Sequence, residues 1–108
     1  MTALVTGASK GVGKGIALEL ARAGAAIIVN YNADQQGAQN TLAEIRSVGG
    51  EAIAIQADVG VAGDVDRMFR QALVKFPRIQ ILVNNAGVQT WKPLLELTEA
   101  EWDRRQRD

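Results

Sequence analysis

The sequence predicts an α/β fold, a three-layer sandwich in which helices cover both faces of a parallel β-sheet. Segments typical of strands and segments typical of helices alternate along the chain from its first residues. Two of the strand segments, Ala25–Asn30 and Ile79–Asn84, are almost continuously apolar, as expected of parallel strands buried on both faces. Alternation at this spacing favours parallel strands joined by right-handed crossovers.

In the first half of the chain, strands are expected at Thr2–Thr6 and Ala25–Asn30. The helix expected between them, Val12–Ala23, repeats apolar residues at close to the helical period. Gly24 follows this helix, where a C-terminal cap is expected. A second helix is expected at Ala33–Val48, and it stops at a pair of glycines.

In the second half, a strand is expected at Ala52–Gln56, a helix at Asp64–Phe76 and a strand at Ile79–Asn84. Pro77 follows the helix and cannot take the positive φ of a glycine cap, so this helix must end differently. A last helix is expected to begin at Thr98, where the sequence has a capping box. We find no linker or repeat, so the prediction is a single domain over residues 1–108.

The composition is that of an ordinary globular domain, with 47% hydrophobic and 22% charged residues in 108. The 12 Lys and Arg residues balance the 12 Asp and Glu residues, so no net charge favours nucleic acid or an anionic membrane as a partner. Cysteine and histidine are absent, which excludes disulfides, thiolate or imidazole metal ligands and a histidine-based triad. No apolar run reaches the roughly 20 residues of a membrane span. We expect no metal, no membrane contact and, without a signal peptide, a cytoplasmic location.

Residues 6–13, TGASKGVG, place three glycines between the first strand and the first helix. Such a turn puts bare backbone N–H groups at a helix N-terminus, whose dipole favours an anion. The missing side chains of Gly7, Gly11 and Gly13 would let a pyrophosphate approach the backbone closely. A tight turn that needs positive φ is the alternative, but one glycine would satisfy it. We therefore expect a phosphate-binding loop, with the spacing G-x-x-x-G-x-G rather than G-x-G-x-x-G.

This loop resembles the TGxxxGxG cofactor motif of the short-chain dehydrogenase/reductase family. Asn84-Asn85-Ala86-Gly87 is similar to the family's NNAG motif after the fourth strand, and Asp58-Val59 to its adenine-contacting pair. The resemblance runs from residue 2 to about residue 104. Within the family, the sequence is most similar to those of bacterial glucose 1-dehydrogenases and 3-oxoacyl-carrier-protein reductases. It implies a Rossmann-like sheet with strand order 3-2-1-4, truncated before the fifth strand.

The resemblance also implies a set of cofactor-binding residues and an oxidoreductase that acts on CH–OH groups. Several of these residues have a structural alternative: the Ser9 hydroxyl donates to a phosphate or satisfies the turn, and Asp58 accepts from adenine or caps a turn. Asn84 and Asn85 can satisfy backbone groups at the strand end, and Thr6 can tie the first strand to the neighbouring loop. The expected set is Gly7, Ser9, Lys10, Gly11, Val12, Gly13, Asn30, Tyr31, Asn32, Asp58, Val59, Asn85, Ala86 and Gly87.

Two of these positions bear on the choice of dinucleotide. By resemblance, Tyr31 stands where NAD-preferring members carry Asp, and Lys10 stands where NADP-preferring members carry Arg or Lys. A cation near the 2′-phosphate favours NADP by charge pairing. Against this, Asn32 replaces a usual Arg, and Lys10 can also be read as a solvated surface lysine. We expect NADP, with NAD as the alternative.

The residues that carry the family's chemistry are missing from this chain. Members use a tyrosine, a lysine four residues later and a serine about a dozen residues earlier, whereas the one tyrosine here, Tyr31, is followed by Gln35 at that spacing. The ending Arg105–Asp108 departs from the family's usual Asn-Leu continuation. We therefore expect no catalytic residue, and an NAD(P)-binding portion that is inactive alone.

Two further hypotheses stay open. In one, a second chain or a longer chain supplies the catalytic half. In the other, the chain is a non-enzymatic remnant or a self-associating module with no cofactor. The truncation would leave the edge of the strand Ile79–Asn84 unpaired, which predicts self-association through that edge.

Overall fold

Four parallel strands form the centre of the fold in the order β3-β2-β1-β4, which confirms the predicted order. The structure is a computed structural model that describes residues 1–85 and 90–97. The strand bounds agree with the predicted ones to within a residue: β1 is Thr2–Val5, β2 is Ala26–Tyr31, β3 is Ala52–Gln56 and β4 is Ile79–Asn84.

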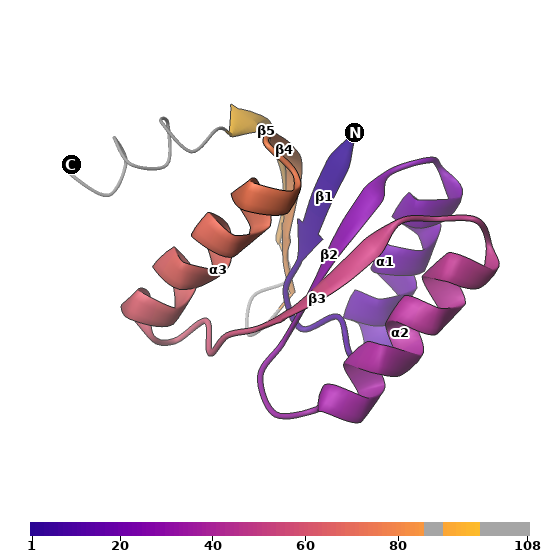
Figure 1. The fold of residues 1–108 in the computed structure, drawn as a ribbon, viewed down its shortest axis with the longest axis horizontal. Coiled ribbons are helices and arrows are strands. Elements are labelled where there is room, and N and C mark those ends of the chain that lie inside the picture. Colours follow the sequence, from indigo (N-terminus) through magenta and orange to yellow (C-terminus); the bar gives the residue numbers. More distant parts are fainter. Residues whose placement is uncertain (86–89, 98–108) are drawn as a thin grey trace.

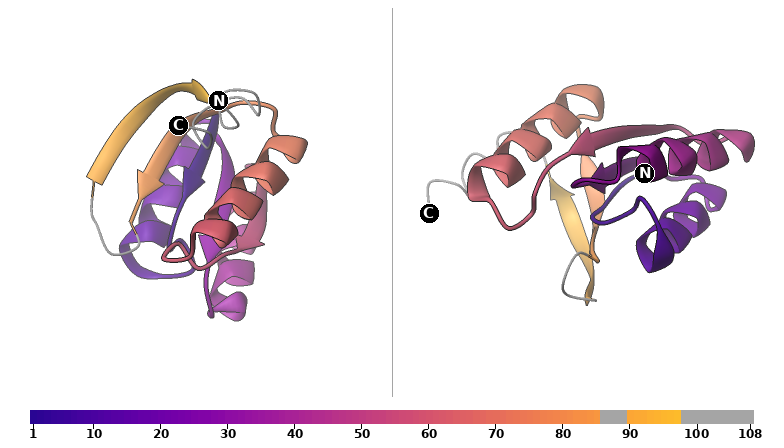
Figure 2. Two further views of the ribbon diagram at one scale, coloured as in Figure 1. Left: turned by 90° about the vertical axis from the view of Figure 1, so that its left-hand side faces the viewer. Right: turned by 90° about the horizontal axis from the view of Figure 1, so that it is seen from below.

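Helices cover both faces of this sheet, as Figures 1 and 2 show. On one face lie α1 (Gly11–Arg22) and α2 (Gln35–Ser47), and on the other lies α3 (Ala62–Lys75). The helix α2 starts two residues later than predicted, because the Asp34 side chain accepts from the N–H of Gly37 and forms the cap. The predicted three-layer sandwich is therefore present.

The strands supply two separate apolar cores, one for each face of the sheet. Successive residues of a strand point to opposite faces, so Leu4 and Ile28 pack on the α3 side while their neighbours pack on the α1 and α2 side. This explains why the sequences of β1 and β2 have no polar alternation. The neighbours on the α1 and α2 side are Ala3, Val5, Ile27 and Val29.

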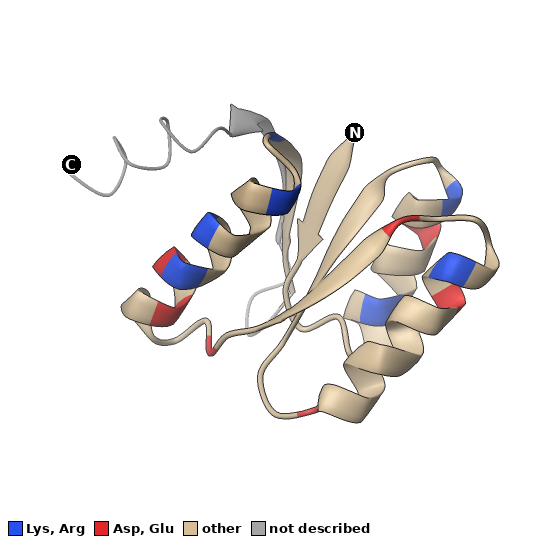
Figure 3. Ribbon diagram, viewed as in Figure 1, with Lys and Arg blue, Asp and Glu red and all other residues tan. Residues whose placement is uncertain are grey.

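The strands β1 to β4 contain no charged residue. In residues 1–85, which Figure 3 colours, the charges lie on the helices and in the loops. One ion pair joins the two helices that share a face: Lys14 Nζ lies 2.6 Å from Glu44 Oε2. Within the described residues, none of the helices combines the length and the apolar composition needed to cross a membrane.

The helix α3 ends without a glycine cap, as Pro77 required. Phe76, the residue after Lys75, is extended (φ −125°, ψ 103°), and its N–H still donates to Ala72 O at 2.8 Å. The chain then enters β4, where the Gln80 side chain accepts from the N–H of Thr2 at 2.8 Å. A side-chain bond thus ties the start of β1 to β4.

The expectation that the edge of β4 is open was wrong. A fifth strand, β5 (Thr90–Leu97), pairs with β4 in antiparallel register and covers that edge, as the left view of Figure 2 shows. The physical reason is that an unpaired strand edge carries N–H and C=O groups that gain partners when the following segment folds back. The register shifts between Ile79 and Ile81, where Pro93, which has no N–H, faces Ile81. The helix predicted from Thr98 lies outside the described residues.

Candidate functional site

The glycine-rich loop lies between β1 and α1, at the carboxyl ends of the parallel strands. Each of its three glycines has its own structural reason. Gly7 and Gly11 have positive φ values of 61° and 62°, a conformation that other residues rarely take. A Cβ on Gly13 would overlap the carbonyl oxygen of Gly7 and lie 2.7 Å from Asn85 Nδ2. Other residue types would therefore strain the backbone at Gly7 and Gly11, and a side chain at Gly13 would clash with its neighbours.

The N-terminus of α1 presents backbone donors without acceptors. Lys10 occupies the N-cap position without a side-chain cap, and the first turn contains no acidic residue. Within residues 1–85 and 90–97, no hydrogen bond engages the N–H groups of Gly11, Val12 or Gly13. These donors and the positive end of the helix dipole form a site that favours an anion.

Asn30, at the end of β2, holds the loop from below. Its Oδ1 accepts from the N–H of Gly7 at 3.2 Å, and its backbone oxygen accepts from the N–H of Ala8 at 2.9 Å. Its Nδ2 donates to the carbonyl oxygen of Ile55, which lies on β3, at 3.4 Å, and to that of Ala57, just after β3, at 3.2 Å. The residue is only 2% exposed, so its side chain connects three segments inside the protein.

The segments that follow β1 and β4 are tied together at Thr6. The N–H of Asn85 donates to Thr6 Oγ1 at 2.9 Å, and that hydroxyl lies 3.3 Å from Asn84 Oδ1. Asn85 Nδ2 donates to Gly7 O at 3.3 Å. The predicted tie through Thr6 is thus confirmed. The Asn85 side chain satisfies a backbone carbonyl, as the structural alternative proposed, whereas the Asn84 side chain pairs with the Thr6 hydroxyl.

Two residues that the sequence analysis did not single out hold the loop from α2. Thr41 Oγ1 lies 2.9 Å from Ala8 O, to which it donates, and a Cβ on Gly37 would lie 2.7 Å from Ser9 O. A signal for Thr41 did exist in the sequence. It lies beside the apolar stripe of the helix, where a buried hydroxyl needs a partner.

The residues expected near the adenosine lie, like the glycine-rich loop, at the carboxyl ends of the parallel strands. Asp58 forms a turn: its Oδ1 accepts from the N–H of Gly60 at 2.9 Å, and its own N–H donates to Asp64 Oδ2 at 2.9 Å. The exposed Asn32 accepts from Gln56 Nε2 at 3.2 Å through both its backbone and side-chain oxygens. Tyr31, just before it, is half-buried.

The remaining predicted residues differ in exposure. Lys10 is exposed, Val12 is 60% exposed and Ser9 is 9% exposed. Val59 is half-buried and lines a mainly apolar hollow of about 180 Å³. Ala86 and Gly87 lie outside the described residues. The other residues that line the hollow are Thr6, Val65, Met68, Phe69, Leu82 and Asn84.

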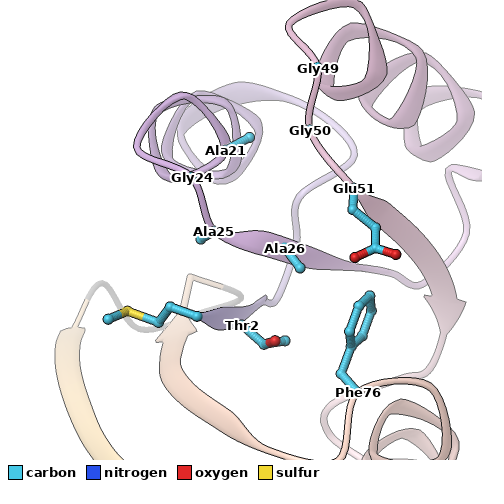
Figure 4. A pocket seen from close by; sticks show the side chains of 10 residues that line it. Thr2, Ala21, Gly24, Ala25, Ala26, Gly49, Gly50, Glu51 and Phe76 are labelled. Carbon is cyan, nitrogen blue, oxygen red and sulfur yellow. The ribbon is translucent and has the colours of Figure 1, made fainter.

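A larger pocket of about 370 Å³ lies at the opposite edge of the sheet (Figure 4). Met1 and Thr2 at the start of β1, Ala26 at the start of β2, and Glu51 before β3 all contribute to its walls. Because the amino ends of the strands form this pocket, it is separate from the glycine-rich loop at their carboxyl ends. The described residues contain no cluster of acidic side chains that could hold a metal ion.

The decisive observation about ancestry is the extent of the sequence match. Residues 1–106 match the family model for short chain dehydrogenases, and this span includes the whole loop and all four parallel strands. The chain belongs to the short chain dehydrogenase family. Membership implies a nicotinamide dinucleotide as the cofactor, which agrees with the anion site at the N-terminus of α1.

Two relatives of this chain have names that describe reductases. A hydroxynaphthalene reductase-like protein Arp2 from Metarhizium robertsii is 48% identical over 102 residues, which cover 94% of this chain and 38% of the relative. A 3-oxoacyl-[acyl-carrier-protein] reductase from Synechocystis is 48% identical over 100 residues, which cover 93% of this chain and 40% of the relative. The chain therefore spans about two fifths of the length of the relatives it matches.

Solved structures of other family members have the same fold. A dehydrogenase/reductase from Sinorhizobium meliloti matches with a TM-score of 0.78 and 40% identity, over 95% of this chain and 41% of that protein. The promiscuous reductase LugOII, described as catalysing a keto-reduction in lugdunomycin biosynthesis, matches with a TM-score of 0.74 and 43% identity, over 81% of this chain and 38% of its own. The short chain dehydrogenase fold of the described part is thus shown by both sequence and structure.

Proposed function

We propose that this chain binds NADP through the loop Gly7–Gly13, as the nucleotide-binding portion of a short chain dehydrogenase. The observation that carries the proposal is the set of unengaged N–H groups at the start of α1, beside Gly13, where a side chain would clash with Gly7 O, and beside Gly7 and Gly11, which have positive φ. When bound, NADPH supplies the hydride for reduction of a carbonyl group. What this chain contributes is binding and orientation of that cofactor.

The pyrophosphate end of the site consists of backbone donors. The N–H groups of Gly11, Val12 and Gly13 lie in the first turn of α1, and the helix dipole adds a partial positive charge there. The Ser9 hydroxyl is a further donor in the loop. The side-chain nitrogens of Asn30 and Asn85 already donate to protein carbonyls. These residues therefore contribute to cofactor binding indirectly, by holding the loop in place.

The adenosine end is assigned to the residues that follow β2 and β3. The hollow beside Val59 offers an apolar wall for a base, and one oxygen of Asp58 is already used by the Gly60 N–H. Tyr31 and Asn32 would face the ribose. The exposed Lys10 would pair with a 2′-phosphate, which is the basis for proposing NADP over NAD.

The nicotinamide end is assigned to the segment after β4, which begins with Asn85 and where Ala86 and Gly87 would leave the floor beneath the ribose open. This chain holds no proton donor for the reaction, because its only tyrosine is Tyr31 at the adenosine end and no lysine follows four residues later. We propose that the 108-residue chain binds cofactor without reducing a substrate by itself. Carbonyl reduction is the reaction we propose for the whole protein, and a cytoplasmic location belongs to the same proposal.

Isothermal titration calorimetry of the chain with NADP, NAD and 2′,5′-ADP tests this function. We expect binding of all three, with NADP tighter than NAD and 2′,5′-ADP retaining most of the affinity of NADP. The fold of the sample is checked first by circular dichroism. A folded sample that releases or absorbs no heat with any of the three ligands would contradict the proposal.

A further inference from the structure

The helix α2 contacts two successive residues of the glycine-rich loop, Ala8 and Ser9. Thr41 is fully buried, and its hydroxyl lies 2.9 Å from Ala8 O and 3.0 Å from Gly37 O. One turn earlier in the helix, Gly37 approaches Ser9 so closely that a Cβ would lie 2.7 Å from Ser9 O. Both contacts therefore involve carbonyl groups of the loop.

The direction of a carbonyl group determines the direction of the next N–H group. A trans peptide unit is planar, so its C=O and N–H point in opposite directions. Because Ala8 O points to Thr41, the N–H of Ser9 points away from α2. Because Ser9 O faces Gly37, the N–H of Lys10 also points away from α2. Within the described residues, neither N–H group has an acceptor.

We infer that Thr41 and Gly37 are positioning residues, which orient the N–H groups of Ser9 and Lys10 toward a phosphate of the bound dinucleotide. This inference rests on the proposed function, since it assigns to α2 a part in the affinity of the same site. Thr41 acts by holding the Ala8 carbonyl, and Gly37 acts by leaving space for the Ser9 carbonyl. Neither residue touches the ligand.

Two variants of Thr41 distinguish a positioning role from a purely structural one, because they separate the effect of its hydroxyl on ligand affinity from that of its methyl group. The valine variant Thr41→Val keeps the volume and loses the hydroxyl, whereas Thr41→Ser keeps the hydroxyl and loses a methyl group. If Thr41 only fills space, affinity follows the methyl group, as stability does. If Thr41 positions the loop, affinity follows the hydroxyl.

The first experiment titrates each variant with 2′,5′-ADP by calorimetry, at a temperature well below all melting midpoints. We expect Thr41→Val to raise the Kd about tenfold, which corresponds to about 1.4 kcal/mol. We expect Thr41→Ser to bind like the unaltered chain. The matched control is Ser47→Ala, which removes a hydroxyl on the same helix that donates to Glu44 O at 2.7 Å and lies far from the loop. Wild-type affinity in Thr41→Val, or weak binding in Thr41→Ser alone, would overturn the inference.

A second pair of variants tests Gly37 without altering a hydroxyl. We expect Gly37→Ala to weaken binding of 2′,5′-ADP, because the new Cβ would lie 2.7 Å from Ser9 O and would also meet the carboxylate of Asp34, the side chain that caps α2, so that both must shift. The control is Gly63→Ala, also in the first turn of a helix, where a Cβ would meet no atom within 4 Å. Undiminished binding in a folded Gly37→Ala sample would overturn the inference.

A third measurement needs no substitution. Hydrogen exchange of the unaltered chain is followed with and without saturating 2′,5′-ADP, and the N–H groups of Ser9 and Lys10 should become protected. Binding by calorimetry without protection of either group would overturn the inference and leave the proposed function intact. No binding at all would instead reject the proposed function.

Discussion

Gly13 faces the carbonyl oxygen of Gly7 across the turn, and a Cβ at residue 13 would overlap that oxygen. The same Cβ would lie 2.7 Å from Asn85 Nδ2, which donates to Gly7 O at 3.3 Å. The side chain that is missing at residue 13 thus makes room for a hydrogen bond between the loops after β1 and β4. Packing at this point joins two parts of the site that are far apart in the sequence.

The first prediction concerns Gly13→Ala. We expect it to lower the free energy of unfolding by about 1–3 kcal/mol, because the added methyl group meets backbone that cannot move freely. It should also abolish binding of 2′,5′-ADP, since the loop must shift. Urea denaturation and calorimetry measure the two effects.

The matched control for this prediction is Gly15→Ala, two residues further along the same helix. A Cβ at residue 15 would meet no atom within 4 Å, so this change should leave stability equal or raised by about 0.4–1 kcal/mol. Equal effects of the two variants would show that helix propensity, rather than the contact with Gly7, determines the outcome.

The second prediction concerns the buried Asn30. We expect Asn30→Ala to lower the free energy of unfolding by about 1–3 kcal/mol, because the N–H of Gly7 and the carbonyl of Ala57 lose their partner. Ligand binding should weaken as the loop loses its support from β2. The control, Asn40→Ala, removes an exposed amide that accepts from Gln36 Nε2 at 3.0 Å, and it should cost much less. Similar losses in both variants would contradict this role for Asn30.

The third prediction concerns the choice of cofactor. If the exposed Lys10 pairs with the 2′-phosphate, Lys10→Ala should weaken NADP and leave NAD almost unchanged. A well-formed charge-assisted bond contributes about 1.5–3 kcal/mol, and exposure to solvent reduces this value. The control is Lys75→Ala, in the last turn of α3. An unaltered ratio of the two Kd values in Lys10→Ala would exclude this role.

The parallel core and the loop could be predicted from the sequence because their signals are local. Continuous apolar runs identified β2 and β4, and three glycines in seven residues identified the loop. The strand β5 could not be predicted in this way. Its pairing depends on the free edge of β4, and Pro93 argues against a strand when the segment is considered alone.

The supports of the loop escaped prediction for a related reason. Thr41 meets Ala8 across 33 residues of sequence, and Asn30 meets Ala57 across 27, so no local pattern identifies the partner of either residue. Asn30 was predicted to bind cofactor through the family resemblance. Asn30 is buried inside the protein, so we expect it to support the proposed cofactor site by holding the glycine-rich loop from beneath. Buried polar residues beside an apolar helix stripe are the signal that would have identified Thr41.

The last prediction is that the 108-residue chain alone gives no steady reduction of carbonyl compounds with NADPH. Hydride transfer to a carbonyl leaves negative charge on oxygen, which a positioned acid must neutralise. Such general acid catalysis contributes typically about 10²- to 10⁴-fold to the rate, and alignment of the two reactants contributes more. Tyr31 is at the end of β2, no histidine is present, and Lys92 is the only lysine after Asn85.

The measurement follows the absorbance of NADPH with the purified chain and a panel of ketones and sugars. Two samples give the comparison: the unaltered chain, and Gly13→Ala, which should not bind cofactor. Turnover that copurifies with the chain and disappears in Gly13→Ala would mean that an acid other than Tyr31 serves the reaction, and the prediction would be wrong. Turnover that arises only when a separate polypeptide with a Tyr-x-x-x-Lys segment is added would instead place the proton donor on that second chain, while the cofactor stays on this one.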